Sequence, residues 1–177
     1  MTKTYTSHTP DETQEIAAAF ASSLRSGDVV CLEGELGAGK TVFAAGVARG
    51  LGVDEHVTSP TYPIVAEYRG SMPLFHLDLY RIKDSAEARD TGLEDYIGNA
   101  GVTLIEWPSR AEDILPDDCI TVKISDSRGA TRDMDSNAAE TGAENVEQEG
   151  ALCRGLSTRI ITICYPDAAQ EGGSVSL

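Results

Sequence analysis

Basic residues are scarce in this 177-residue chain, which carries 14 Lys and Arg against 29 Asp and Glu. The formal net charge is therefore −15. Such a negative charge disfavours direct binding to the phosphate backbone of RNA or DNA. If nucleic acid matters to this protein, we expect another protein to hold it. The length suits one domain with a substantial core rather than two domains.

Long apolar runs and recognisable cysteine motifs are also missing. The first ten residues lack a basic region followed by an apolar one, and no apolar run approaches the roughly 18 residues that a membrane span needs. We therefore expect a soluble, cytoplasmic protein with no membrane partner. The cysteine spacing matches neither a zinc site nor a redox motif, so reduced, structural thiols are expected. The four cysteines are Cys31, Cys119, Cys153 and Cys164.

One stretch near the C-terminus lacks both basic and aromatic residues. Between Asp133 and Gly150 there are six acids, a composition that cannot bury enough apolar area to offset the entropy of ordering. We predict a disordered acidic insertion at about residues 126–157 and a flexible tail from about residue 167, within a single domain of residues 1–177. We interpret the insertion as a solvated spacer; the alternative is a segment that binds another molecule.

Strand-like and helix-like patterns alternate along the rest of the chain. Thr9, Pro10 and Glu12 are placed as the N-cap, first and third residues of a helix that Gly27 ends. The alternation predicts a three-layer α/β fold with a mainly parallel sheet and antiparallel edge strands. The predicted strands are residues 28–34, 62–69, 73–81, 101–107, 119–124 and 159–165. The further predicted helices are residues 41–52, one or two short helices within 84–98, and 109–115.

The segment GELGAGKT, residues 34–41, lies between a predicted strand and a predicted helix. It matches the phosphate-loop pattern G-x-x-x-x-G-K-[ST], in which glycines let backbone N–H groups converge on an anion at a helix start. Lys40 can then reach the β and γ phosphates, and Thr41 can offer its hydroxyl to Mg²⁺. The alternative, a plain glycine-rich turn, is disfavoured by the flanking strand and helix.

Two acids at or near the ends of predicted strands are candidates for the magnesium site. A magnesium nucleotide needs a carboxylate at the tip of a neighbouring strand. Glu106 closes a buried run, where an acid is costly unless a cation or hydrogen bonds meet it. Asp78 lies on the non-core face of residues 73–81, which we expect to be available for chemistry, together with His76 as a supporting candidate. Either acid could instead be a satisfied strand-end carboxylate.

Two further features adjoin these candidates. Trp107, the only tryptophan, directly follows Glu106, so its ring could stack on a base or close over the site; an ordinary half-buried aromatic is the alternative. HVTSPTYP, residues 56–63, follows the helix of the phosphate loop. Its position suits a switch-like segment whose hydroxyls sense the γ-phosphate, with a proline-stiffened loop as the alternative.

Together these stretches resemble one family, the bacterial TsaE ATPases of tRNA threonylcarbamoyladenosine biosynthesis. The phosphate loop alone would indicate only a nucleotide binder, whereas its combination with Ser59-Pro60-Thr61, the run from His76 to Arg81 and Glu106-Trp107 is specific. The resemblance covers most of residues 9–125. The matching segments are EGELGAGKTVFAAGVARGLG, VTSPTYPIVAEY, FHLDLYRI and LIEWP, with DET at 11–13.

The resemblance implies a small P-loop NTPase-like ATPase that uses ATP and Mg²⁺ and is weak without its partners. Those partners would be threonylcarbamoyl-transferase proteins of the TsaD and TsaB type, which modify adenosine 37 of tRNAs that read codons beginning with A. The tRNA would be held only through them. ATP turnover would reset their complex between rounds rather than make the modification itself.

The resemblance also implies roles for individual residues. Thr41 and Glu106 would hold Mg²⁺, Asp78 would orient or activate the attacking water, and Lys40, Asp78 and Glu106 would be the catalytic set. Thr13 and Trp107 would lie near the nucleotide. The phosphates would be cradled by Leu36, Gly37, Ala38, Gly39, Lys40 and Thr41.

Some points stay open at this stage. The family sometimes places an arginine from its last strands on the nucleotide, and either Arg154 or Arg159 could take that part. A nucleotide-gated binding module without functional hydrolysis is the alternative to an ATPase. A small-molecule phosphotransferase is disfavoured because the chain has no arginine-rich lid segment.

Overall fold

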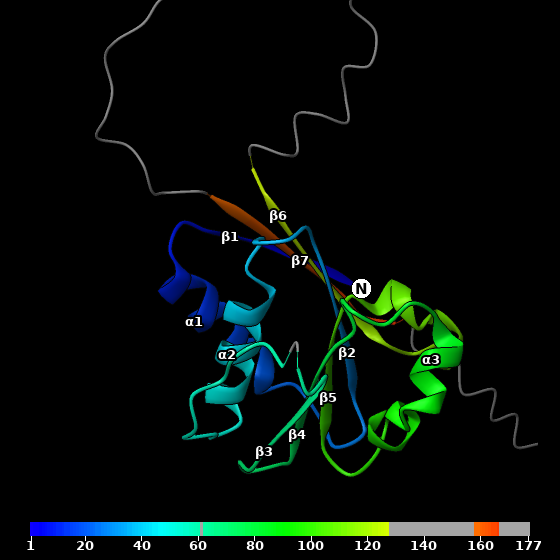
Figure 1. Ribbon diagram of the computed structural model, residues 1–177. Coiled ribbons are helices and arrows are strands. Elements are labelled where there is room, and N and C mark those ends of the chain that lie inside the picture. Colours follow the sequence, from blue (N-terminus) through cyan, green and yellow to red (C-terminus); the bar gives the residue numbers. More distant parts are fainter. Residues whose placement is uncertain (61, 128–157, 167–177) are drawn as a thin grey trace, which may run out of the picture.

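The computed structural model describes residues 1–60, 62–127 and 158–166, which form one seven-stranded sheet with helices on both faces (Figure 1). The strand order is β1-β7-β6-β2-β5-β4-β3. The predicted tail from residue 167, and all of the predicted insertion except its first two residues, lie outside the described residues. The strands are β1 (Thr2–Ser7), β2 (Val29–Glu33), β3 (Val65–Tyr68), β4 (Leu74–Asp78), β5 (Val102–Glu106), β6 (Ile120–Asp126) and β7 (Arg159–Cys164).

The sheet is mixed rather than mainly parallel. The four central strands β6, β2, β5 and β4 are parallel to one another, whereas β7 and β1 on one side and β3 on the other pair antiparallel. The antiparallel share is larger than expected because β1 was not among the predicted strands. The carboxyl ends of β2, β4 and β5 lie at the same edge of the sheet, since the three strands are parallel neighbours.

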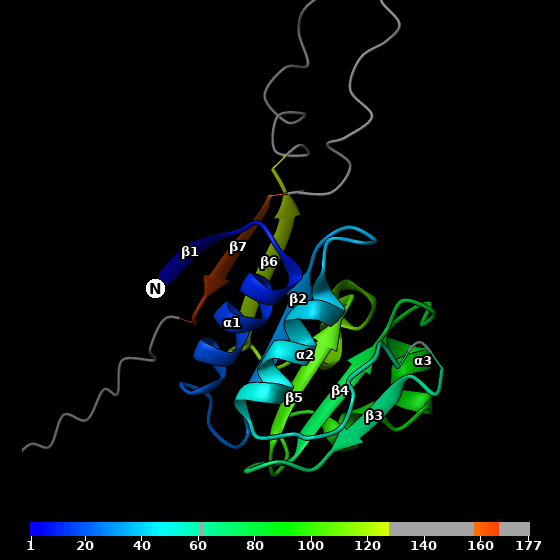
Figure 2. The same ribbon diagram turned by 90° about the vertical axis from the view of Figure 1, so that its left-hand side faces the viewer.

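Helices cover both faces of the sheet, as the alternation in the sequence predicted (Figure 2). α1 (Pro10–Ala21) and α2 (Lys40–Gly50) pack on one face, where Phe20 and Val47 meet Val30 and Leu104 of the central strands. The other face carries α3 (Ser85–Asp90) and the 3-10 helices η1 (Leu93–Tyr96), η2 (Pro108–Arg110) and η3 (Glu112–Ile114). Within the described part of the chain, none of the helices has the length and apolarity that crossing a bilayer requires.

The start of α1 confirms the capping pattern of the sequence. The Thr9 hydroxyl accepts a hydrogen bond from the backbone N–H of Glu12 at 3.1 Å, and Pro10 occupies the first turn. The Glu12 carboxylate accepts a bond in return from the backbone N–H of His8 at 2.7 Å. The first of these bonds satisfies a donor that the helix start leaves unpaired, and the second ties the preceding residue to the first turn. The predicted helix at 109–115 is instead two 3-10 turns, separated at Ala111, whose φ of −145° is not helical.

Gly46 of α2 lies where α1 and α2 cross. A β-carbon there would lie 2.6 Å from the Ala17 β-carbon and 2.6 Å from the backbone oxygen of Gln14, so the helices would have to separate. We expect Gly46→Ala to lower the free energy of unfolding by about 1–3 kcal/mol, even though alanine is the better helix former. Denaturant unfolding measures the change, with Arg49→Ala on the exposed side of α2 as the control. Wild-type stability in Gly46→Ala would contradict this close packing.

Candidate functional site

The phosphate loop, residues 34–41, connects β2 to α2 at the carboxyl edge of the central strands. Its three glycines, Gly34, Gly37 and Gly39, have φ angles of +152°, +81° and +111°, which other residues rarely adopt. A β-carbon on Gly34 would also clash with the backbone oxygen of Ile124 in β6. The loop therefore has the backbone geometry that its glycines predicted, directly before a helix N-terminus.

Lys40 is folded back inside this loop. Its side chain is only 5% exposed, and its Nζ donates to the carbonyl oxygens of Gly34 at 2.8 Å and Glu35 at 3.0 Å. The same Nζ lies 4.0 Å from the ring centroid of Trp107. Burial lowers the pKa of the Lys40 ammonium, while the nearby carboxylates of Glu106 and Asp78 oppose that shift. A buried cation is thus available at the centre of the loop.

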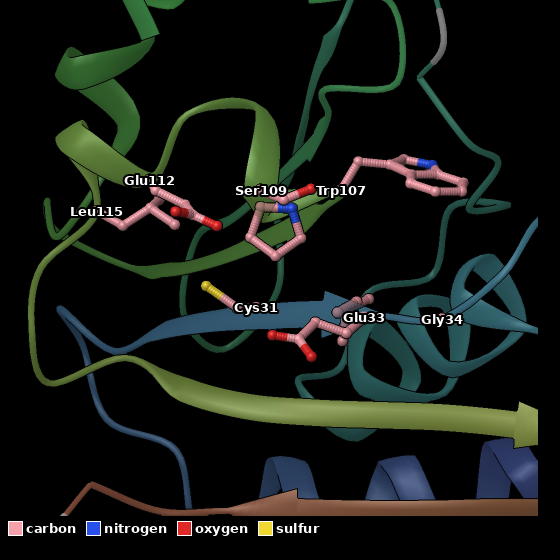
Figure 3. Close-up of a pocket in the computed structure, with 9 residues that line it drawn as sticks. Cys31, Glu33, Gly34, Trp107, Ser109, Glu112 and Leu115 are labelled. Atoms are coloured by element: carbon pink, nitrogen blue, oxygen red, sulfur yellow. The ribbon is translucent and has the colours of Figure 1, made fainter. Parts of the chain in front are cut away.

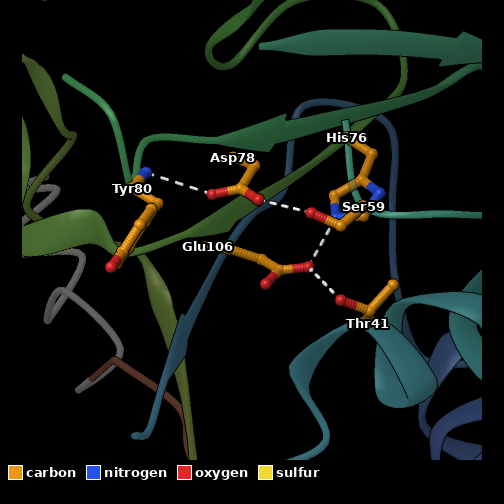
Figure 4. A network of polar contacts seen from close by, with 6 residues as sticks. All are labelled: Thr41, Ser59, His76, Asp78, Tyr80 and Glu106. Atoms are coloured by element: carbon orange, nitrogen blue, oxygen red, sulfur yellow. Dashed lines mark hydrogen bonds and ion pairs between the residues drawn. The ribbon is translucent and has the colours of Figure 1, made fainter. Parts of the chain in front are cut away.

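Glu106, at the end of β5, lies opposite the first turn of α2 (Figure 4). It is 3% exposed, and its Oε1 accepts a hydrogen bond from the Thr41 hydroxyl at 3.0 Å. His76 Nε2 lies 3.0 Å from the same oxygen. The structure therefore brings Thr41 and Glu106 together as a hydroxyl and a carboxylate beside the phosphate loop.

Asp78, at the end of β4, is held from two sides. The Ser59 hydroxyl donates to its Oδ2, and the backbone N–H of Tyr80 donates to its Oδ1 at 3.0 Å. Ser59 belongs to the loop that follows α2, so the predicted switch-like segment does contact the candidate site, whereas Thr61 lies outside the described residues. Asp78 is directly paired with Glu106 in the register of β4 and β5, which places two carboxylates side by side.

The predicted non-core face of β4 is buried, since Leu74 on that face belongs to the core cluster beneath α1 and α2. It is nevertheless available for chemistry, as expected, because Asp78 on it lines a hollow beside the phosphate loop. His76 has no exposed surface and Asp78 is 4% exposed, because they share the face of Leu74, which the cluster beneath α1 and α2 covers. Tyr80, beyond the strand end, is exposed. The polar side chains of this face therefore lie against Glu106 of β5 and the hollow beside the loop rather than in open solvent.

Trp107 covers the site from the β5 side. It follows Glu106 in a left-handed conformation, with φ 61° and ψ 51°, and this unfavourable backbone directs the chain away from the sheet. Its ring lies 5.2 Å from that of Tyr80. Trp107, residues of the phosphate loop, Asp78 and Glu106 line the hollow beside the loop, which has a volume of about 420 Å³. Trp107 also lines a second hollow of about 420 Å³, with Cys31, Glu33, Ser109 and Glu112 among its other residues (Figure 3).

Two other predicted contacts have different outcomes. The Thr13 side chain is fully buried, 2.7 Å from the Ser7 hydroxyl, and donates to the backbone of Thr9, so the structure does not bring it to the hollow. Arg159, the first residue of β7, lines the hollow and donates through Nε to the Ala38 carbonyl at 3.0 Å. Arg154 lies outside the described residues. No composition or spacing signal pointed to Arg159.

The described cysteines are free thiols, as predicted. Cys31 on β2 is buried, and a hydrogen bond with Cys119 together with burial raises the pKa of its thiol. Cys153 lies outside the described residues. Cys31 and Cys119 belong to the packing between the sheet and the 3-10 helices, and neither they nor Cys164 line the hollow beside the phosphate loop.

Comparison with known proteins gives consistent matches. A family model described as "Threonylcarbamoyl adenosine biosynthesis protein TsaE" matches residues 7–134. The "tRNA threonylcarbamoyladenosine biosynthesis protein TsaE" of Bacillus subtilis (strain 168) is 40% identical over 141 residues, or 79% of this chain and 88% of that protein. The protein of the same name from Treponema pallidum is 36% identical over 118 residues, or 67% and 87%. The crystal structure of Bacillus subtilis YdiB matches with a TM-score of 0.66 and 31% identity, over 92% of this chain and 84% of that chain.

Proposed function

The chain belongs to the TsaE family and has that family's role in tRNA threonylcarbamoyladenosine biosynthesis; from this premise we propose that it is a magnesium-dependent ATPase with a P-loop NTPase-like fold. It acts together with threonylcarbamoyl-transferase proteins of the TsaD and TsaB type. Its turnover supports repeated rounds of modification, and tRNA is held by those partners. The net charge of −15 supports this division of labour, because it disfavours direct contact with RNA.

The observation that carries the proposal is the meeting of the phosphate loop with Glu106. Backbone N–H groups of a glycine-rich loop at a helix start bind phosphate oxygens. Lys40 adds a buried positive charge at the same place. Since Lys40 now bonds to Gly34 and Glu35 within the loop, phosphates would compete with those carbonyls for its ammonium.

The residues present also fit a magnesium ion that arrives with the nucleotide. Among the described residues, no group of three or more His, Cys, Asp or Glu side chains could hold a metal unaided. Mg²⁺ commonly takes only one or two protein ligands beside waters and phosphate oxygens. Thr41 and Glu106, already 3.0 Å apart, supply such a pair. When bound, the ion would neutralise charge on the transferring phosphoryl group.

We assign to Asp78 the role of orienting the attacking water. It lines the same hollow as Lys40 and Glu106, and the bonds from Ser59 and the Tyr80 backbone hold its carboxylate in one orientation. A fixed carboxylate can accept a proton from, or align, a water next to the γ-phosphate. Arg159 lies at the loop, where its guanidinium would add positive charge toward the phosphates.

Trp107 provides a direct test of nucleotide binding. It is the only tryptophan, and its ring lies 4.0 Å from Lys40 Nζ, so phosphates that draw Lys40 away should change its emission. We expect a saturable change with ATP and with ADP and none with adenosine, which has no phosphate. Trp107→Phe controls for signals from elsewhere. Equal responses to adenosine and ATP, or no response to ATP, would contradict a phosphate site in this loop.

One observation favours the second candidate function, a nucleotide-gated binding module. Lys40 contacts loop carbonyls and the Trp107 ring, and phosphate binding would replace those contacts. The surface around Trp107 and Tyr80 would then differ between the free and bound states. Affinity for the transferase partners that is the same with ATP, with ADP and without nucleotide would rule this candidate out.

A further inference from the structure

His76 is a buried polar residue to which the proposed chemistry gives no role. It lies on β4 with no exposed surface, and its Nε2 is 3.0 Å from Oε1 of Glu106. Within the described residues, its Nδ1 is the only buried side-chain nitrogen or oxygen that has no hydrogen-bond partner. Burying a histidine with one unpaired nitrogen is costly, so its other contact deserves an explanation.

The two ring nitrogens of His76 have opposite surroundings, which assigns the tautomer. Nε2 faces a carboxylate oxygen, which accepts hydrogen bonds, so Nε2 carries the hydrogen and donates. Nδ1 has no acceptor, and a hydrogen there would be a buried donor without a partner. The contacts therefore favour the Nε2–H tautomer, with a lone pair on Nδ1.

The donors to Glu106 converge on one of its two oxygens (Figure 4). Thr41 Oγ1 and His76 Nε2 both lie 3.0 Å from Oε1. No hydrogen bond within the described residues uses Oε2, and Glu106 lines the hollow beside the phosphate loop. Two donors on Oε1 fix the plane of the carboxylate and leave the second oxygen for a ligand in that hollow.

We propose that His76 is a positioning residue whose Nε2–H holds Glu106 in the orientation that binds the Mg²⁺ of the nucleotide. This inference rests on the proposed function. Thr41 is itself a proposed ligand of the ion, so His76 is the donor to Glu106 that does not have to serve the ion as well. Neighbours that orient a metal-binding side chain commonly contribute about 10–100-fold to metal affinity.

A matched pair of variants separates positioning from packing. His76→Gln places an amide N–H as far from the backbone as Nε2, whereas His76→Asn has a similar polarity but is too short to reach Glu106. Thr103→Val is a second control, because it removes another buried hydrogen bond, to the Tyr96 carbonyl at 2.6 Å, without touching Glu106. ATP binding is measured at increasing MgCl₂ and also without metal.

We expect the Mg²⁺ concentration for half-maximal enhancement of ATP binding to rise about 10-fold or more in His76→Asn. It should stay at the wild-type value in His76→Gln and in Thr103→Val. Metal-free ATP binding should be the same in all four proteins. Wild-type magnesium dependence in His76→Asn would overturn the inference and leave the proposed function standing, whereas a wild type without any magnesium effect would overturn both.

A measurement on the wild-type protein, without metal or nucleotide, tests the contact itself. The ¹⁵N chemical shifts of a histidine ring distinguish its tautomers, and the chain has three histidines to assign. We expect His76 as the Nε2–H tautomer. An Nδ1–H tautomer would leave Nε2 with no hydrogen to donate to Glu106 and would overturn the inference.

Discussion

Lys40→Ala is expected to lower ATP turnover by about 100-fold or more, measured as phosphate release with the partner proteins present. The substitution removes a buried cation whose Nζ lies inside the phosphate loop. Positive charge placed in advance beside the transferring phosphoryl group stabilises the charge of the transition state. Because Nζ also contacts the Trp107 ring, the same variant should lose the emission change on adding ATP.

Lys123→Ala is the matched control for this loss. Lys123 is an exposed residue of β6 that pairs with Glu33 at 3.2 Å, and such surface pairs contribute little to stability. We expect wild-type turnover and an unchanged melting temperature. Phosphate release near the wild-type rate in Lys40→Ala would contradict the assignment of Lys40 to the phosphates.

Glu106→Gln is expected to reduce turnover by a comparable factor, about 100-fold at a fixed magnesium concentration. The glutamine keeps the size of the side chain, and its carbonyl oxygen can still accept from Thr41 and His76. What it loses is the negative charge that a hard cation needs from this position. The free energy of unfolding should therefore change far less than the rate.

Glu33→Gln provides the comparison at the end of the neighbouring strand. Glu33 is partly exposed and pairs only with Lys123 among the described ion pairs, so its charge should matter little to turnover. Turnover and unfolding are measured together on both variants. If Glu106→Gln keeps wild-type turnover at low magnesium, or loses activity only because it unfolds, the carboxylate does not hold the ion.

The loop and its flanking elements could be predicted from the sequence because the signals are local. Glycines, Lys40 and Thr41 at fixed spacing specify the turn and the helix start, and the structure has β2, the loop and α2 in that order. The end of β5 was also located, to within one residue, from its apolar run, whereas β4 ends at Asp78, before the predicted end at residue 81. Asp78 and Glu106 lie side by side because β4 and β5 pair in parallel. A right-handed crossover connection between consecutive strands favours such pairing, but a single sequence does not specify it.

What the sequence could not predict depends on contacts between distant segments. β1 is nearly all exposed and owes its position to pairing with β7, from Thr2 with Cys164 to Ser7 with Arg159. Its β-branched threonines were a weak signal that no apolar alternation supported. Pairing of β7 with β6, which lies beside β2, places Arg159 at the phosphate loop, although a long acidic segment precedes it in the sequence. Burial of His76 likewise depends on tertiary packing, because it shares a face of β4 with Leu74, which belongs to the core cluster that includes residues of α1 and α2.

The measurement that tests the proposed role most directly is multiple-turnover formation of threonylcarbamoyladenosine on tRNA, followed by nucleoside mass spectrometry. The partner proteins are supplied with either the wild-type chain or Lys40→Ala, and Lys123→Ala serves as the control. We expect wild type and Lys123→Ala to sustain rounds beyond the first and Lys40→Ala to stop after one. If Lys40→Ala sustains them equally, ATP hydrolysis at this loop does not drive the cycle, and the protein acts as a binding module.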